Sequence, residues 1–155
     1  MSTAISDELY QQVILDNNRS PHNFRKVENA TYVAEGLNPL CGDAYTIYIT
    51  MRAEGVIKEV AFHGAGCAIS KASGSLMTDA LVGMTVAEAE ALFTNFHELV
   101  LGENEDKVPM SSLGKLRVFA GVWRYPARVK CAALPWHAMR SALHGESRVS
   151  TEDKM

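Results

Sequence analysis

Two strand patterns joined by a tight turn constrain the fold of this chain more than any other feature. Residues 44–51 alternate between two faces, and one face carries Tyr45, Ile47, Ile49 and Met51. This alternation is typical of a strand with one buried face. Glu54-Gly55 favours a turn, after which residues 56–62 return as the antiparallel partner. Residues 31–34 are predicted to add a third strand at an edge, giving an antiparallel sheet of about three strands.

Helical patterns lie on both sides of this segment in the sequence. A first helix is expected from a cap at Ser6 or Asp7 to Asn17-Asn18. A second, rich in Ala, Ser and Met, is expected over residues 67–81, and its composition predicts close packing on the sheet. Thr85 is expected to cap a third helix that extends to Val100.

The C-terminal third is also predicted to be helical. After an exposed loop at residues 102–109, a short helix is expected over residues 113–123 and a last one from Pro126 to about His144. Proline suits the first turn of a helix, where its missing N–H has no partner. Pro135 deletes a backbone bond inside this last helix, so a kink near Cys131 is predicted. The polar residues 145–155 are expected to form a flexible tail.

The composition is that of a globular protein. Of 155 residues, 47% are hydrophobic and 21% charged, and the net charge is −3. This length fits one α+β domain over residues 1–155. No block of Lys and Arg suggests a nucleic-acid partner. No apolar run reaches the roughly 20 residues of a membrane span, and the first residues lack the apolar segment of a signal peptide. A cytoplasmic protein without a membrane partner is therefore expected.

The three cysteines point to chemistry, because an odd number argues against a disulfide framework. In the reducing cytosol, cysteines are more often metal ligands or reactive groups. Cys41 and Asp43 flank Gly42 in a loop that enters a strand, and residues two apart in extended backbone point to the same side. They can face one metal ion, since thiolate and carboxylate both bind zinc. The alternative is a small buried cysteine followed by a turn aspartate.

Cys67 follows Gly64 and Gly66, where a strand ends and a helix begins. The two glycines are expected to permit a sharp turn. The unpaired N–H groups at a helix N-terminus favour a thiolate, the form that binds zinc or attacks sulfur. The alternative is a buried structural cysteine.

Arg128 lies one helical turn before Cys131 and shares its face, so it can stabilise a thiolate or bind the carboxylate of Asp43. Three thiolates and one carboxylate make a closed tetrahedral set for zinc, although the spacings are not the short Cys-x₂-Cys kind. Two histidines are further candidate ligands, but a polar strand end explains His63 better. His137 is expected to face away from Cys131 on a regular helix.

These motifs together resemble the SufU/IscU family of iron–sulfur cluster assembly proteins, which includes the N-terminal domain of NifU. The resemblance extends from Leu9 to Trp136 and includes the segments Asn38-Pro39-Leu40-Cys41-Gly42-Asp43, Gly64-Ala65-Gly66-Cys67-Ala68-Ile69-Ser70 and Tyr125-Pro126-Ala127-Arg128-Val129-Lys130-Cys131-Ala132. IscU-type scaffolds usually have His where this chain has Lys130. That difference, and an insertion at about residues 102–113, favour the SufU type. The chain departs from the family at Asp16-Asn17-Asn18 and at Pro135.

The resemblance implies the IscU fold, an antiparallel three-stranded sheet covered on one side by helices. It also implies a zinc-dependent sulfurtransferase that accepts persulfide sulfur on Cys41 from a SufS-type cysteine desulfurase, with a SufBCD-type scaffold downstream. Zn²⁺ would be held by Cys41, Asp43, Cys67 and Cys131. Cys41 would leave the ion to carry sulfur, and Arg128 would support that state through Asp43.

Two other functions fit the same residues. The first is a scaffold on which Cys41, Cys67 and Cys131 hold a transient [2Fe–2S] cluster or iron, and an aspartate ligand suits a labile cluster. The second is a non-catalytic, zinc-stabilised interaction domain, in which Cys41 would be dispensable. Metal content after anaerobic purification separates the carrier from the scaffold.

Overall fold

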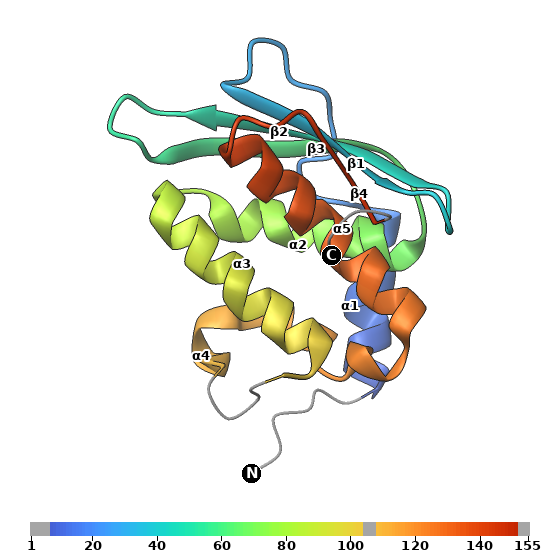
Figure 1. The fold of residues 1–155 in the computed structure, drawn as a ribbon. Coiled ribbons are helices and arrows are strands. Elements are labelled where there is room, and N and C mark those ends of the chain that lie inside the picture. The colour runs from blue at the N-terminus through green and yellow to red at the C-terminus, as the bar shows by residue number, and fades with distance from the viewer. Residues whose placement is uncertain (1–6, 104–107, 152–155) are drawn as a thin grey trace.

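The computed structural model describes residues 7–103 and 108–151 and shows a sheet covered on one side by helices (Figure 1). This arrangement confirms the predicted α+β class. In chain order, the elements are α1 (Asp7–Arg19), β1 (Tyr32–Asn38), β2 (Asp43–Met51), β3 (Ile57–Ala65), α2 (Ala68–Leu81), α3 (Val86–Leu101), α4 (Met110–Leu113), the 3₁₀ segments η1 (Gly114–Phe119) and η2 (Val122–Arg124), α5 (Pro126–Leu143) and β4 (Arg148–Ser150).

Within the described residues, the sheet has four strands in the order β3-β2-β1-β4. β2 pairs antiparallel with both β1 and β3, whereas β4 runs parallel to β1. The prediction of three antiparallel strands was therefore wrong in number and in type. The strand expected at an edge, β1, lies inside the sheet. Residues 148–150 of the expected flexible tail form the edge strand beside it, while residues 152–155 lie outside the described part.

β4 was missed because a strand of three residues has no alternation to detect. Its ends are nevertheless well anchored. The N–H of Glu35 donates to the carbonyl of Ser147 (2.9 Å), and the N–H of Thr151 donates to the carbonyl of Leu37 (2.9 Å). Arg148 also forms an ion pair with Glu35 (2.9 Å). These contacts bring the C-terminal segment to the end of β1 that precedes Cys41.

The hairpin of β2 and β3 has the predicted faces, with Tyr45, Ile47 and Ile49 at most 1% exposed. β3 continues beyond the expected end at Phe62 as far as Ala65. Gly64 therefore belongs to the sheet and pairs with Tyr45, and it makes no sharp turn. Only glycine fits there, because a Cβ would lie 2.1 Å from the carbonyl oxygen of Ala44.

α2 packs closely on the sheet, as its small residues predicted. A Cβ on Gly74 would lie 2.7 Å from the ring of Phe62. The hydroxyl of Ser73 donates to the carbonyl of Ala132 on α5 (2.6 Å) and accepts from the indole N–H of Trp136 (3.1 Å). Small residues thus let α2 approach both the sheet and α5, the helix that carries Cys131.

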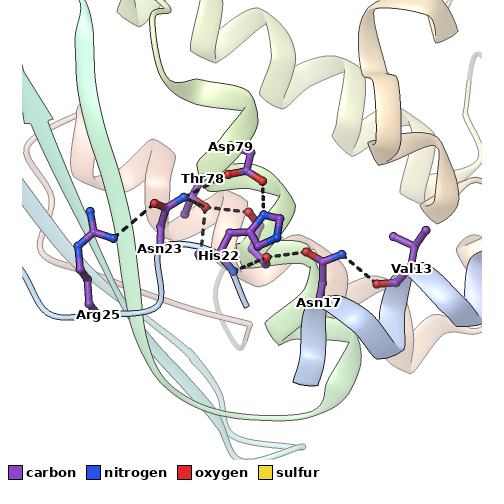
Figure 2. Close-up of polar contacts among 8 residues, drawn as sticks. Val13, Asn17, His22, Asn23, Arg25, Thr78 and Asp79 are labelled. Carbon is purple, nitrogen blue, oxygen red and sulfur yellow. Dashed lines mark hydrogen bonds and ion pairs between the residues drawn. The ribbon is translucent and has the colours of Figure 1, made fainter. Parts of the chain in front are cut away.

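Polar contacts attach α1 and the segment after it to α2 (Figure 2). The hydroxyl of Ser75 donates to the side-chain oxygen of Asn17 (2.6 Å) and accepts from the N–H of His22 (2.8 Å). The ring of His22 pairs with Asp79. The side-chain amide of Asn23 donates to the hydroxyl of Thr78 (2.9 Å). The surface segment between α1 and β1 is thereby fixed along one side of α2.

The remaining helix predictions were confirmed in part. Thr85 caps α3 with a full capping box, and Pro126 occupies the first turn of α5. Pro135 lies inside α5, and the kink near Cys131 stays a prediction. The short helix expected over residues 113–123 is instead α4 followed by two 3₁₀ segments. None of the helices among residues 7–103 and 108–151 has the length and apolar character needed to cross a bilayer.

Candidate metal centre

The candidate site lies where the β1–β2 turn, the start of α2 and the first turns of α5 meet. The carbonyl of Asn38 accepts the N–H groups of Cys41 (3.2 Å) and Gly42 (2.8 Å), which closes a tight turn after β1. Cys41 is exposed on this turn, and Asp43, 2% exposed, begins β2. Cys131 is buried on α5. The fold thus joins residues from opposite ends of the chain.

Three of the four predicted ligands form one group that can hold a metal ion. One ligand atom each from Cys41, Asp43 and Cys131 lies within 4.8 Å of the other two. The sulfur atoms of Cys41 and Cys131 are 3.9 Å apart. Tetrahedral zinc with Zn–S bonds of about 2.3 Å places two sulfurs about 3.8 Å apart. The spacing of this thiol pair therefore fits zinc without rearrangement.

The fourth predicted ligand, Cys67, is not part of that compact group but is connected to it. Cys67 is the N-cap of α2, and its sulfur accepts the N–H of Ser70 (3.4 Å). Its own N–H donates to Oδ1 of Asp43 (2.8 Å). The predicted position at a helix N-terminus was confirmed, and the donors there favour a thiolate.

The charge states of Cys67 and Cys131 are linked. A hydrogen bond from the Cys131 thiol lowers the pKa of Cys67 to about 6, with further help from Ser70 and against the effect of burial. The same contact with Cys67 raises the pKa of Cys131, and burial and the nearby carboxylate of Asp43 add to this. Clustered anionic ligands oppose one another until a cation joins them, so the cluster is suited to bind one.

Gly66 shows how tightly the site is built. A Cβ at this position would lie 2.5 Å from Oδ1 of Asp43, 2.6 Å from the hydroxyl of Tyr45 and 2.8 Å from the hydroxyl of Ser70. The glycine leaves room for the Asp43 carboxylate beneath the turn into α2. The second glycine of the motif therefore serves close approach to the candidate ligand rather than backbone freedom.

The other candidate residues lie apart from this group. Arg128 is exposed, and its guanidinium lies 4.5 Å from the centre of the Tyr125 ring. Its charge also acts on Tyr10, where it opposes the rise in pKa caused by burial. From the sequence, a thiolate or the carboxylate of Asp43 could be its partner, and the supporting role through Asp43 stays a prediction. The ring of His63 lies against that of Phe24 in a tilted arrangement, with ring centres 4.9 Å apart. His137 packs against Phe93 and His97 within the helical layer.

Sequence reasoning missed two residues beside the site. The buried side chain of Asn38 lies 3.5 Å from Asp43 and 3.8 Å from the sulfur of Cys131. Its oxygen accepts the hydroxyl of Thr151 (3.0 Å). Asn38 is the first residue of the motif that contains Cys41 and Asp43, so its position in the sequence could have indicated a role at the site. Thr151 has no such signal, because its strand was not detected.

Comparison with known proteins places this architecture among related chains. The model of the NifU-like N terminal domain family matches residues 9–132. The chain is 37% identical over 140 residues to the iron-sulfur cluster assembly scaffold protein IscU of Thermotoga maritima, covering 90% of this chain and 96% of the relative. It is 37% identical over 142 residues to the zinc-dependent sulfurtransferase SufU of Bacillus subtilis, covering 90% and 92%. FiSufU of Fervidobacterium islandicum AW-1 has a similar crystal structure, with a TM-score of 0.80 at 37% identity, covering 90% and 99%.

Proposed function

Because the chain belongs to the NifU-like N-terminal domain family, and within it to the SufU/IscU type, we propose that it is a zinc-dependent sulfur carrier of iron–sulfur cluster assembly. The proposed donor of sulfur is a SufS-type cysteine desulfurase, and the proposed downstream acceptor is a SufBCD-type scaffold. The Thermotoga relative is named as an iron–sulfur cluster assembly scaffold protein, and the Bacillus relative as a zinc-dependent sulfurtransferase.

The proposed zinc ligands are Cys41, Asp43, Cys67 and Cys131. The group of three with its 3.9 Å sulfur pair fits the ion, and Cys67 lies one hydrogen bond from Asp43. When bound, zinc supplies a positive charge that keeps the thiols deprotonated at neutral pH. The chain itself supplies the frame, since Asp43 and Cys131 are buried and enter from the sheet and from α5.

One observation carries the assignment of sulfur acceptor to Cys41. Of the three cysteines, all of which lie in the described part of the chain, Cys41 is the exposed one, on a turn that projects beyond β1 and β2. Cys67 is half-buried and Cys131 is buried. A persulfide on a partner enzyme can reach an exposed thiol on a turn far more readily than one beneath a helix.

The proposed transfer is a thiol–persulfide exchange. The thiolate of Cys41 attacks the outer sulfur of the desulfurase persulfide, and a new sulfur–sulfur bond forms on Cys41. The bond between the two sulfurs of the desulfurase breaks, and its cysteine leaves as a thiolate. The electron pair of the broken bond leaves with that cysteine, and the thiolate of Cys41 supplies the pair of the new bond, so no external oxidant or reductant takes part. Cys67, Cys131 and Asp43 remain in place as the proposed anchors. We assign Arg128, which is exposed in the first turn of α5, only a supporting role, as part of the face that receives the partner.

The test is transfer of labelled sulfur from a cysteine desulfurase supplied with ³⁵S-cysteine. The native chain should gain one reducible label per molecule, and Cys41→Ser should gain none while keeping its circular dichroism spectrum. The matched control is Cys41→Ser combined with Ser112→Cys, which places an exposed thiol on α4, away from the site. Labelling of Cys41→Ser at the native level would overturn the proposal.

A second candidate function is a scaffold for a transient [2Fe–2S] cluster, with Cys41, Cys67 and Cys131 as ligands. The specific observation in its favour is the name of the Thermotoga relative, an assembly scaffold protein. Anaerobic purification separates the two. One zinc per chain and no visible absorbance supports the carrier, whereas iron, sulfide and a brown colour support the scaffold.

A further inference from the structure

The side chain of Asn38 borders the candidate metal site without being one of the proposed ligands. It is 1% exposed at the end of β1, directly opposite Asp43 in the register of the two strands. Its amide nitrogen lies 3.5 Å from Oδ2 of Asp43 and 3.8 Å from the sulfur of Cys131. The nitrogen of one amide group thus lies within hydrogen-bond reach of both ligands.

The orientation of this amide depends on the C-terminal segment. The hydroxyl of Thr151 donates to the side-chain oxygen of Asn38 (3.0 Å), and Thr151 is itself 4% exposed. If the amide were flipped, its oxygen would face the carboxylate of Asp43 and the sulfur of Cys131, which are both acceptors. The contact with Thr151 therefore favours the orientation that presents donors to the ligands.

β4 holds Thr151 at this position. The N–H of Thr151 donates to the carbonyl of Leu37 (2.9 Å), one residue before Asn38. Arg148 adds an ion pair with Glu35 at the other end of β4. A segment that the sequence presents as a polar tail thus contributes a buried hydroxyl beside the metal site.

We propose that Asn38, oriented by Thr151, is a positioning residue that holds Asp43 and Cys131 as a pair of metal ligands. This inference rests on the zinc site proposed above. Groups that hydrogen-bond to metal ligands fix their orientation, and loss of such a group typically lowers metal affinity 10- to 100-fold. The C-terminal strand would therefore help set the affinity for the ion even though it carries none of the ligands.

The experiment measures zinc affinity by chelator competition and the visible spectrum of the Co²⁺-loaded protein, whose bands report the ligand geometry. Thr151→Val removes the hydroxyl at nearly constant shape and should lower affinity about 10-fold, with altered Co²⁺ bands. Thr151→Ser keeps the hydroxyl and should behave as the native chain. Thr94→Val removes a hydroxyl at an exposed position on α3, and it should leave both readouts unchanged.

A double-mutant cycle tests whether Thr151 acts through Asn38. In an Asn38→Leu background, Thr151→Val should have no further effect on affinity. If Asn38→Leu does not fold, the comparison of Thr151→Val with Thr151→Ser and Thr94→Val decides by itself. Native affinity and native Co²⁺ bands in Thr151→Val, or an equal loss in Thr94→Val, would overturn the inference. Failure of the native chain to bind zinc at all would instead overturn the proposed function.

Discussion

At the scale of single residues, Gly66 limits what the candidate metal site tolerates. In Gly66→Ala, the added methyl would lie 2.5 Å from Oδ1 of Asp43, inside any normal contact distance. Because the carboxylate is buried and hydrogen-bonded to the N–H of Cys67, it can move only by giving up that bond. We expect zinc affinity to fall at least about 10-fold, as measured by chelator competition.

The neighbouring Ala65 provides the control. It is exposed at the end of β3, so Ala65→Ser adds one atom to the same turn without approaching Asp43. Its zinc affinity should equal that of the native chain. If Gly66→Ala also binds zinc with native affinity, the Asp43 carboxylate is not confined as the structure indicates.

The candidate ligands could be predicted from sequence because their signals are local. Asp43 follows Cys41 by two residues, and Cys67 follows a glycine pair at a helix start. The contact between Asn38 and Thr151 could not, since 113 residues separate the two. From the sequence, Arg128 could face either a thiolate or the carboxylate of Asp43, and its contacts in the structure could not be predicted for a related reason. Spacing on a helix gives the direction of a side chain, but the nearby Tyr125 ring, 4.5 Å away, offers the guanidinium a different partner.

At the scale of elements, α2 depends on glycine in a place where helices ordinarily disfavour it. Because alanine has a higher helix propensity than glycine, Gly74→Ala by itself should stabilise α2 by about 1 kcal/mol. The added Cβ would, however, lie 2.7 Å from the ring of Phe62, which is fully buried on β3. Overpacking of this kind typically costs about 1–3 kcal/mol, so we expect a net loss in the free energy of unfolding, measured in urea.

The double variant Gly74→Ala/Phe62→Leu separates the two effects. Phe62→Leu shortens the side chain that meets the new methyl group, so in that background Gly74→Ala should cost less than it does alone. Equal costs in both backgrounds, or a stabilised single variant, would contradict the contact between α2 and β3.

The elements with strong periodic patterns were predictable, and those without them were not. Tyr45, Ile47 and Ile49 alternate clearly, and the hairpin formed with the expected buried face. β4 has only three residues, and its contacts with β1 hold it in the sheet. Its formation therefore depends on tertiary structure and not on a local sequence pattern. The prediction ended β3 too early, because glycine is an ordinary turn residue, whereas Gly64 pairs with Tyr45 inside the sheet.

At the scale of the whole molecule, one cluster of buried apolar residues extends from the sheet to α3 and α5. We propose on this basis that residues 1–155 fold as one domain. The cluster includes Trp136, which stacks on Phe96 with ring centres 4.4 Å apart. His137 follows directly in sequence, and it is the group through which we expect pH to act on the stability of the molecule.

His137 is 8% exposed, and its Nε2 has no hydrogen-bond partner among the described residues. Burial, with smaller contributions from His97 and Arg140, lowers its pKa to about 4, below the 6.5 of an exposed histidine. The unfolded chain therefore binds more protons between these values, and stability should decrease as pH falls from about 7 towards 4. The part due to His137 is at most about 2 kcal/mol between pH 7 and pH 5.

Urea unfolding at pH 7 and pH 5 measures this effect in the native chain and in His137→Gln, which cannot take up the proton. Any loss of zinc at the lower pH acts on both proteins, so the difference between their two pH dependences isolates the histidine. His137→Gln should lose less stability than the native chain does. The exposed His144 provides the matched control, because His144→Gln should keep most of the native pH dependence. An unchanged pH dependence in His137→Gln would mean that the ring is solvated or paired in solution, and that the contact between α3 and α5 is looser than the packing of His137 against Phe93 indicates.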